Sequence, residues 1–234
     1  MNSRPCSVVL IPGFMLDETL WDEFSSELPE DWAVYTGALT GAQSIAGIAR
    51  HIAERSPQRF LLIGFSLGGY VARQLAADFP ERVEALAIVA SSLREDTPQQ
   101  MKLKQQAVNA LSAARFKGLS NSTIANSLHP RRAADADLIA RIKHMGNRLG
   151  YHALATQSAL DRSGVPTESI RCPTLVVAST DDALRSLQEA QELVDAIPNA
   201  SLEIIDDSGH MIPLEQPRAL AATIIHWLQV QGIH

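Results

Sequence analysis

The chain contains little cysteine: Cys6 and Cys172 are the two in 234 residues. Two cysteines in a chain of this length do not make a disulfide framework, and no Cys-x-x-Cys pair is present. We expect both to be inert thiols in a reducing compartment, which predicts a cytoplasmic protein.

The sequence also lacks a long apolar run and an excess of positive charge. No apolar segment is long enough to span a membrane, and the run Ser7–Ile11 is too short for a signal peptide and stops at Pro12-Gly13. A formal net charge of −6 argues against a nucleic-acid binder. With 46% hydrophobic and 20% charged residues, and no repeat or low-complexity tract, the composition predicts one ordinary globular domain.

Short apolar runs alternate with helical patterns along most of the chain. This alternation is typical of a doubly wound, mostly parallel α/β sheet with helices on both faces. Several runs are continuous in Val, Ile and Leu, as in strands that are buried on both faces. The expected strands are Ser7–Ile11, Trp32–Thr36, Arg59–Gly64, Val83–Ala90, Cys172–Ser179 and Ser201–Asp206. The expected core helices are Gly68–Phe79, Ala183–Ile197 and Glu215–Val230.

Residues 93–165 break the alternation, because they are helical in character and contain no convincing strand. The clearest helices are Gln99–Ala114 and Asp135–Leu149. We expect this segment to be a lid over the strand ends, inserted before the penultimate strand. Residues 1–92 and 166–234 then form the core of the same domain. The lid has a net charge of +6 and the remainder of the chain −12.

The most specific motif is Gly64-Phe65-Ser66-Leu67-Gly68, which follows an apolar strand and opens a helix. A serine attacks a carbonyl when a tight turn exposes its hydroxyl and a base lies within reach. Glycines two residues before and after Ser66 let the strand and helix pass closely. The pattern predicts Ser66 as a nucleophile, and the helix N-terminus offers the N–H of Leu67 to a developing oxyanion.

Candidate partners follow later strands in the order Ser, Asp, His that this fold requires. Asp181-Asp182 comes after one predicted strand, and only one of these carboxylates can orient the base. Of the seven histidines, only His210 lies in a loop directly after a strand; the others are expected on helices, in the lid or at the C-terminus. The carboxyl ends of parallel strands share one edge of the sheet, so we expect Ser66, an aspartate and His210 to meet there.

The segment Pro12-Gly13-Phe14 follows the first strand. Acyl transfer needs a second oxyanion donor beside Leu67, and a glycine lets the backbone of this loop approach closely. A proline–glycine turn with no further role is the alternative.

Taken together, these motifs resemble the α/β-hydrolase superfamily over nearly the whole chain, most closely the small single-lid carboxylesterases of the pimeloyl-ester carboxylesterase and enol-lactonase group. The resemblance also rests on Phe79-Pro80-Glu81-Arg82-Val83, Cys172-Pro173-Thr174, Gly209-His210-Met211 and Leu214-Glu215-Gln216-Pro217. It implies that the acid is Asp182, three residues past a glycine position that Ser179 occupies here, and that the oxyanion donors are the N–H groups of Phe14 and Leu67.

Two departures from the family pattern stand out. The usual His-Gly of the oxyanion loop is Pro12-Gly13 here, and the family's two leading strands are missing, so we expect about six strands. The predicted function is hydrolysis of a small or medium carboxylic ester through an acyl-enzyme on Ser66, without a metal or cofactor, by a monomer or homodimer. Hydrolysis of a carbon–carbon bond or a lactone on the same residues, and a low-turnover ligand receptor, are the alternatives.

Substrate choice should depend on the lid. An acyl pocket could be lined by Phe116, Leu119, Leu128, Met145 and Leu149, although packing within the lid explains them equally well. An acidic or carrier-linked ester could be attracted by Arg131, Arg132, Arg141 and Arg148. A solvated basic face is the more common reason for such a run of charge.

Overall fold

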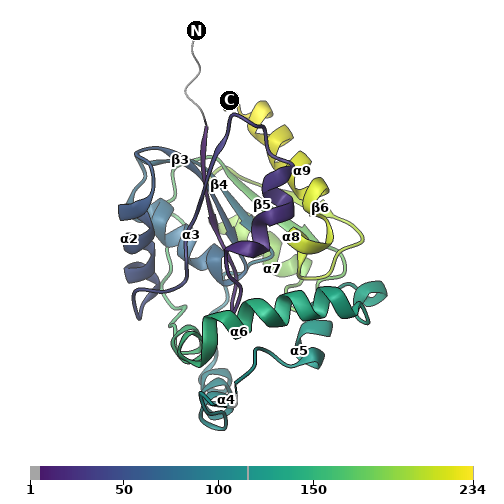
Figure 1. The fold of residues 1–234 in the computed structure, drawn as a ribbon. Helices are drawn as coiled ribbons and strands as arrows, with labels where there is room; N and C mark the ends of the chain where they lie inside the picture. The colour runs from purple at the N-terminus through teal and green to yellow at the C-terminus, as the bar shows by residue number, and fades with distance from the viewer. Residues whose placement is uncertain (1–5, 115, 234) are drawn as a thin grey trace.

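A computed structural model describes residues 6–114 and 116–233 of the chain. They contain a six-stranded parallel sheet in the order β2-β1-β3-β4-β5-β6 (Figure 1). The predicted fold class is confirmed, and each expected strand lies within two residues of an observed one. The strands are β1 (Ser7–Ile11), β2 (Ala33–Thr36), β3 (Phe60–Phe65), β4 (Val83–Val89), β5 (Thr174–Ser179) and β6 (Ala200–Ile205).

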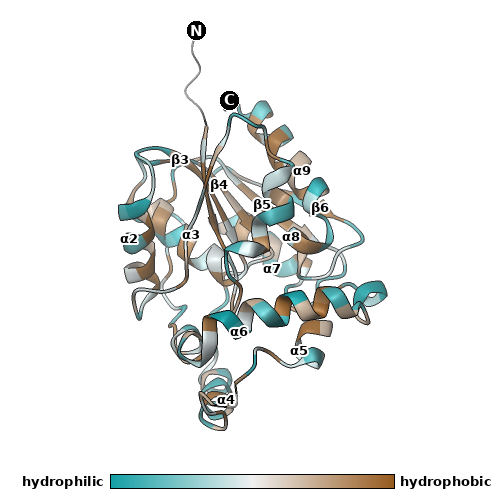
Figure 2. Cartoon of the chain, in the orientation of Figure 1, coloured by the Kyte–Doolittle hydropathy of each residue, from teal (hydrophilic) through white to brown (hydrophobic). Residues whose placement is uncertain are grey.

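Helices cover both faces of the sheet, which is why its central strands are apolar on both sides. In β1, the side chains of Val9 and Ile11 lie on one face of the sheet, and those of Val8 and Leu10 lie on the other. Figure 2 shows the strands as the apolar centre of the molecule. One face is covered by α2 (Ile45–Arg55), α3 (Leu67–Asp78) and α7 (Leu187–Ala196), the other by α1 (Asp22–Ser26), α8 (Ile212–Glu215) and α9 (Pro217–Val230).

Two of the predicted core helices need correction. The helix expected from Ala183 begins at Leu187, because the Asp182 side chain holds the preceding residues in a turn and Ser186 caps α7. The helix expected at Glu215–Val230 is α9 and begins at Pro217, while Glu215 ends the separate helix α8; the two meet at Gln216, whose φ of −136° and ψ of 51° are not helical. Pro217 disfavours a helical conformation in the residue before it, which explains the break.

The segment between β4 and β5 is helical, and we call its elements the inserted helices: α4 (Pro98–Asn109), α5 (Asn121–Ala125), the 3₁₀ turn η2 (Pro130–Arg132) and α6 (Ala136–Ser158). They lie beyond the carboxyl ends of the strands (Figure 1). A break at Gly150, with φ of 78°, divides α6. No strand occurs among residues 93–114 and 116–165, as expected. None of the helices in the described ranges is long and apolar enough to cross a membrane.

Candidate active site

Ser66 lies at the turn between β3 and α3 with φ of 53° and ψ of −113°, a strained conformation for a residue with a side chain. The turn is possible because Gly68 has no side chain: a Cβ there would lie 2.4 Å from the carbonyl oxygen of Pro12. Ser91 supports the turn at the end of β3, because its hydroxyl donates a 2.7 Å hydrogen bond to the carbonyl oxygen of Ser66. These contacts fix Ser66 at the carboxyl end of β3, where it lines the pocket.

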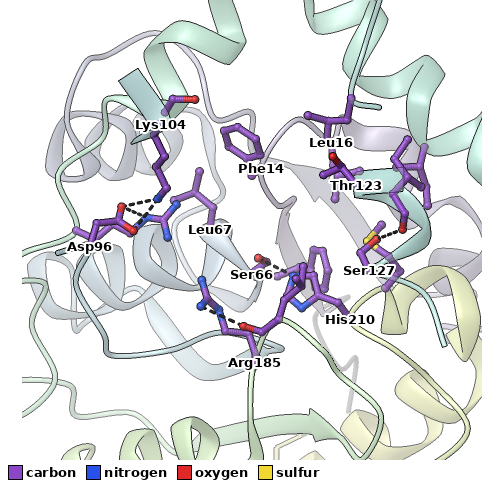
Figure 3. A pocket seen from close by; sticks show the side chains of 18 of the residues that line it. Phe14, Leu16, Ser66, Leu67, Asp96, Lys104, Thr123, Ser127, Arg185 and His210 are labelled. Carbon is purple, nitrogen blue, oxygen red and sulfur yellow. Dashed lines mark hydrogen bonds and ion pairs between the residues drawn. The ribbon is translucent and has the colours of Figure 1, made fainter. Parts of the chain in front are cut away.

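The structure brings Ser66, Asp182 and His210 together. The Nε2 atom of His210 is 2.9 Å from Oγ of Ser66, and its Nδ1 is 2.8 Å from Oδ2 of Asp182. Figure 3 shows Ser66 and His210 side by side at the pocket. The side chains of Asp182 and His210 are 1% and 7% exposed. Water is thus kept away from both partners of this hydrogen bond.

Asp182, rather than its neighbour Asp181, contacts His210. The second oxygen of Asp182 accepts hydrogen bonds from the N–H groups of Leu184 (2.7 Å) and Arg185 (2.9 Å), which fixes the orientation of the carboxylate. Asp181 is exposed and lies 3.7 Å from Nε2 of His129. The local turn after β5 therefore distinguishes the two aspartates.

The loop that carries His210 is fastened to the inserted helices by Glu215. Its buried carboxylate accepts the N–H groups of Gly209 (2.9 Å) and His129 (2.7 Å), one on each oxygen. The N–H of His210 donates to the carbonyl oxygen of Ser127 at 2.8 Å. Sequence reasoning gave Glu215 no role beyond the family match. It placed His129 within the lid without a role, and in the structure this side chain is buried.

The loop after β1 lies beside Ser66. Phe14 and Leu67, whose N–H groups are the predicted oxyanion donors, both line the pocket next to Ser66 (Figure 3). Among the hydrogen bonds within the described ranges, none uses either of these N–H groups. The next residue, Met15, has φ of 57° and donates its N–H to Oε1 of Gln157 at 2.8 Å. Gln157 on α6, which sequence reasoning missed, thus supports this loop.

A pocket of about 410 Å³ opens at Ser66 and His210. Leu119, one of the five candidates for an acyl pocket, lines it, together with Leu16, Ile124, Ile142 and Met211, which were not predicted. The other proposed acyl-pocket residues, Phe116, Leu128, Met145 and Leu149, instead pack into hydrophobic clusters. Charged side chains also line the pocket, and these are Asp96, Lys104, Arg162 and Arg185.

The four arginines considered as a site of attraction for an acidic substrate, Arg131, Arg132, Arg141 and Arg148, do not line this pocket. Each forms an ion pair with a carboxylate: Arg131 with Asp207, Arg132 with Asp135, Arg141 with Glu23 and Arg148 with Asp17. The last two join α6 to the segment after β1, so the positive charge of the inserted helices complements the acidic core. Their role in the structure is thus to pair with neighbouring acids.

The cysteines are free thiols, as predicted. Burial raises the pKa of both Cys6 and Cys172 to about 11, so little reactive thiolate is present near neutral pH. Within the part of the chain that the structure describes, no cluster of three or more His, Cys, Asp or Glu side chains is placed to hold a metal ion.

Comparison with known proteins gives the family. A model described as the alpha/beta hydrolase family matches residues 8–223. The chain belongs to this family, as its sheet topology and the turn at Ser66 had indicated.

Individual relatives are more distant. A pimeloyl-[acyl-carrier protein] methyl ester esterase from Citrobacter koseri is 36% identical over 95 residues, which are 37% of this chain and 37% of the esterase. A Klebsiella pneumoniae protein provisionally named carbamate hydrolase RutD is 29% identical over 198 residues, 80% of this chain and 70% of that protein. The enol-lactonase of Burkholderia xenovorans LB400 superposes with a TM-score of 0.83 at 17% identity, covering 97% of this chain and 93% of the lactonase. This last likeness shows a shared fold.

Proposed function

We propose that the chain is a serine hydrolase that cleaves a small or medium carboxylic ester through an acyl-enzyme on Ser66. The observation that carries this proposal is the connected pair of contacts from Ser66 Oγ to His210 and from His210 to Asp182, 2.9 and 2.8 Å long, at the wall of a pocket. With the Nδ1–H of His210 donated to Asp182, Nε2 is free to accept the serine proton.

Each half of the reaction uses the same residues. The Ser66 proton passes to Nε2 of His210 as Oγ bonds to the ester carbonyl carbon, and the N–H groups of Phe14 and Leu67 stabilise the negative oxygen. The bond to the alcohol oxygen breaks as His210 returns the proton to it, which leaves an acyl-enzyme. A water molecule then loses a proton to His210 and attacks the acyl carbon. The acid is released when the proton returns to Ser66.

The names of the relatives support cleavage of an ester bond more than they support any particular substrate. The name of the Citrobacter koseri protein states that it acts on a carrier-linked methyl ester. We therefore propose an ester substrate for this chain and do not propose a carrier protein, because the alignment covers 37% of each chain. The pocket of about 410 Å³ suits a drug-sized or smaller ester.

The test is hydrolysis of p-nitrophenyl esters of graded acyl length by the wild type and by Ser66→Ala, with Ser122→Ala on the exposed start of α5 as the control. We expect Ser66→Ala to lower turnover by at least about 10⁴-fold and Ser122→Ala to leave it unchanged. A fluorophosphonate should add its mass to Ser66 in the wild type. Turnover that survives in Ser66→Ala would refute the proposal. A wild type that hydrolyses no ester and does not react with the fluorophosphonate would favour the alternative function of a low-turnover ligand receptor. Turnover of ring-cleavage products would instead indicate hydrolysis of a carbon–carbon bond.

A further inference from the structure

Three cations from separate parts of the chain line the same pocket as Ser66. Lys104 comes from α4, Arg162 from the segment after α6 and Arg185 from the turn before α7. In the view of Figure 3, Lys104 and Arg185 lie on one side of Ser66, and Thr123 and Ser127 lie on the other. One wall of the pocket is therefore positively charged.

Two carboxylates neutralise this wall only in part. Asp96 lies 2.6 Å from Lys104 and 3.6 Å from Arg162. Glu189 lies 3.4 Å from Arg185. Three cations thus face two carboxylates, and the group retains one net positive charge. Burial lowers the pKa of Lys104, and the charges of Arg162 and Arg185 act in the same direction, while Asp96 opposes them.

The arginines also present donors that nothing in the described ranges accepts. The Nε atoms of Arg162 and Arg185 are buried and have no hydrogen-bond partner there. The side chain of Arg162 is 11% exposed, and its 3.6 Å separation from Asp96 is too long for a hydrogen bond. A buried charged donor without an acceptor is costly, so the protein leaves part of the hydrogen-bonding capacity of these two guanidinium groups unused.

We propose that the substrate carries a free carboxylate besides its scissile ester, and that Arg162 and Arg185, with Lys104, bind this carboxylate. This inference rests on the proposed ester hydrolysis at Ser66. A half-ester of a dicarboxylic acid is the simplest substrate of this class. The residues that determine this specificity differ from Arg131, Arg132, Arg141 and Arg148, whose charges are paired outside the pocket.

A monoanion fits the wall in charge and in geometry. One carboxylate matches the single unpaired positive charge of the group. The planar guanidinium of arginine presents parallel N–H donors that match the two oxygens of a carboxylate. Asp96 and Glu189 hold the cations in place and would repel a dianion, so we expect preference for one additional carboxylate.

The kinetic test compares mono-p-nitrophenyl adipate with p-nitrophenyl hexanoate, which differ in a terminal carboxylate. We expect the wild type to prefer the adipate at least about tenfold in kcat/KM, and Arg162→Gln and Arg185→Gln each to lower the adipate-to-hexanoate ratio by about 10- to 100-fold, mainly through KM. Arg131→Gln, which removes an exposed and remote cation, should leave the ratio unchanged. If one of the two variants misfolds, which circular dichroism would detect, the other still provides the test.

A binding measurement separates this inference from the proposed function. Calorimetry with Ser66→Ala should detect monomethyl adipate, weaker binding of methyl hexanoate, and loss of monomethyl adipate binding when Arg185→Gln is added. Binding of monomethyl adipate without ester turnover in the wild type would support the carboxylate site while refuting the esterase. Ester turnover with equal preference for both esters, or with a ratio that the arginine variants do not change, would overturn the carboxylate site.

Discussion

The N–H of Met15 donates a 2.8 Å hydrogen bond to Oε1 of Gln157, a side chain that is 1% exposed and lies 142 residues further along the chain. Met15 has φ of 57°, so this loop adopts a backbone conformation that L-residues rarely take. The bond joins α6 to the segment that supplies the proposed oxyanion donor Phe14. It is a direct physical link between the inserted helices and the reaction centre.

Replacement of Gln157 by Met should lower kcat more than it raises KM. The change retains most of the side-chain volume but leaves the buried N–H of Met15 without an acceptor, so the loop loses its support. We expect kcat for p-nitrophenyl butyrate to fall about tenfold or more, because an oxyanion donor acts on the transition state. Gln191→Met, on the exposed side of α7, is the matched control. Equal kinetics for the two variants would contradict a positioning role for Gln157.

Glu215→Gln should destabilise the protein and loosen the His210 loop. Each oxygen of the Glu215 carboxylate accepts one backbone N–H, from His129 and from Gly209, and an amide can accept only one of them. Loss of one hydrogen bond to a charged acceptor costs about 1.5–3 kcal/mol. Urea unfolding measures this change in the free energy of unfolding. Glu203→Gln on the exposed edge of β6 serves as control, and a similar loss there would show that the effect is not specific to Glu215.

The sequence was informative where chemistry depends on short-range pattern. Ser66 follows from glycines two residues to either side of it, and His210 follows from its place in a loop after a strand, because carboxyl ends of parallel strands share an edge. The choice between Asp181 and Asp182 rested on the family resemblance. The structure adds the physical reason, which is the turn that Asp182 forms with the N–H groups of Leu184 and Arg185.

The pocket wall could not be predicted in this way. Arg185 lies in a turn where an apolar periodicity suggested helix, and Arg162 follows α6 in an irregular segment. Which of many basic residues face the pocket depends on how the inserted helices pack on the core. Arg141 illustrates this, since its partner Glu23 is 118 residues away in sequence.

Gly68→Ala should abolish folding or activity, whereas Gly150→Ala should be tolerated. A Cβ at Gly68 would lie 2.4 Å from the Pro12 carbonyl oxygen and 2.5 Å from that of Ile11, and backbone atoms cannot move aside cheaply. At Gly150 a Cβ would meet nothing within 4 Å, so only the backbone strain of φ 78° and ψ 180° remains, about 1–3 kcal/mol. Thermal unfolding and soluble yield compare the two. A Gly68→Ala protein as stable as Gly150→Ala would refute the close-approach argument.

The thiol of Cys172 should make stability depend on pH above neutrality. Burial raises its pKa from 9.0 to about 11, so the folded state holds this proton more tightly than the unfolded state does. The resulting stabilisation is complete below about pH 9 and is lost as the pH rises through about 11, a change of roughly 2–3 kcal/mol. The variant Cys172→Ala lacks this titrating thiol. Urea unfolding of both proteins between about pH 8 and about pH 11.5 should therefore show the wild type losing stability relative to the variant. Parallel pH profiles would mean that the thiol is far less buried in solution than its place beside β5 indicates.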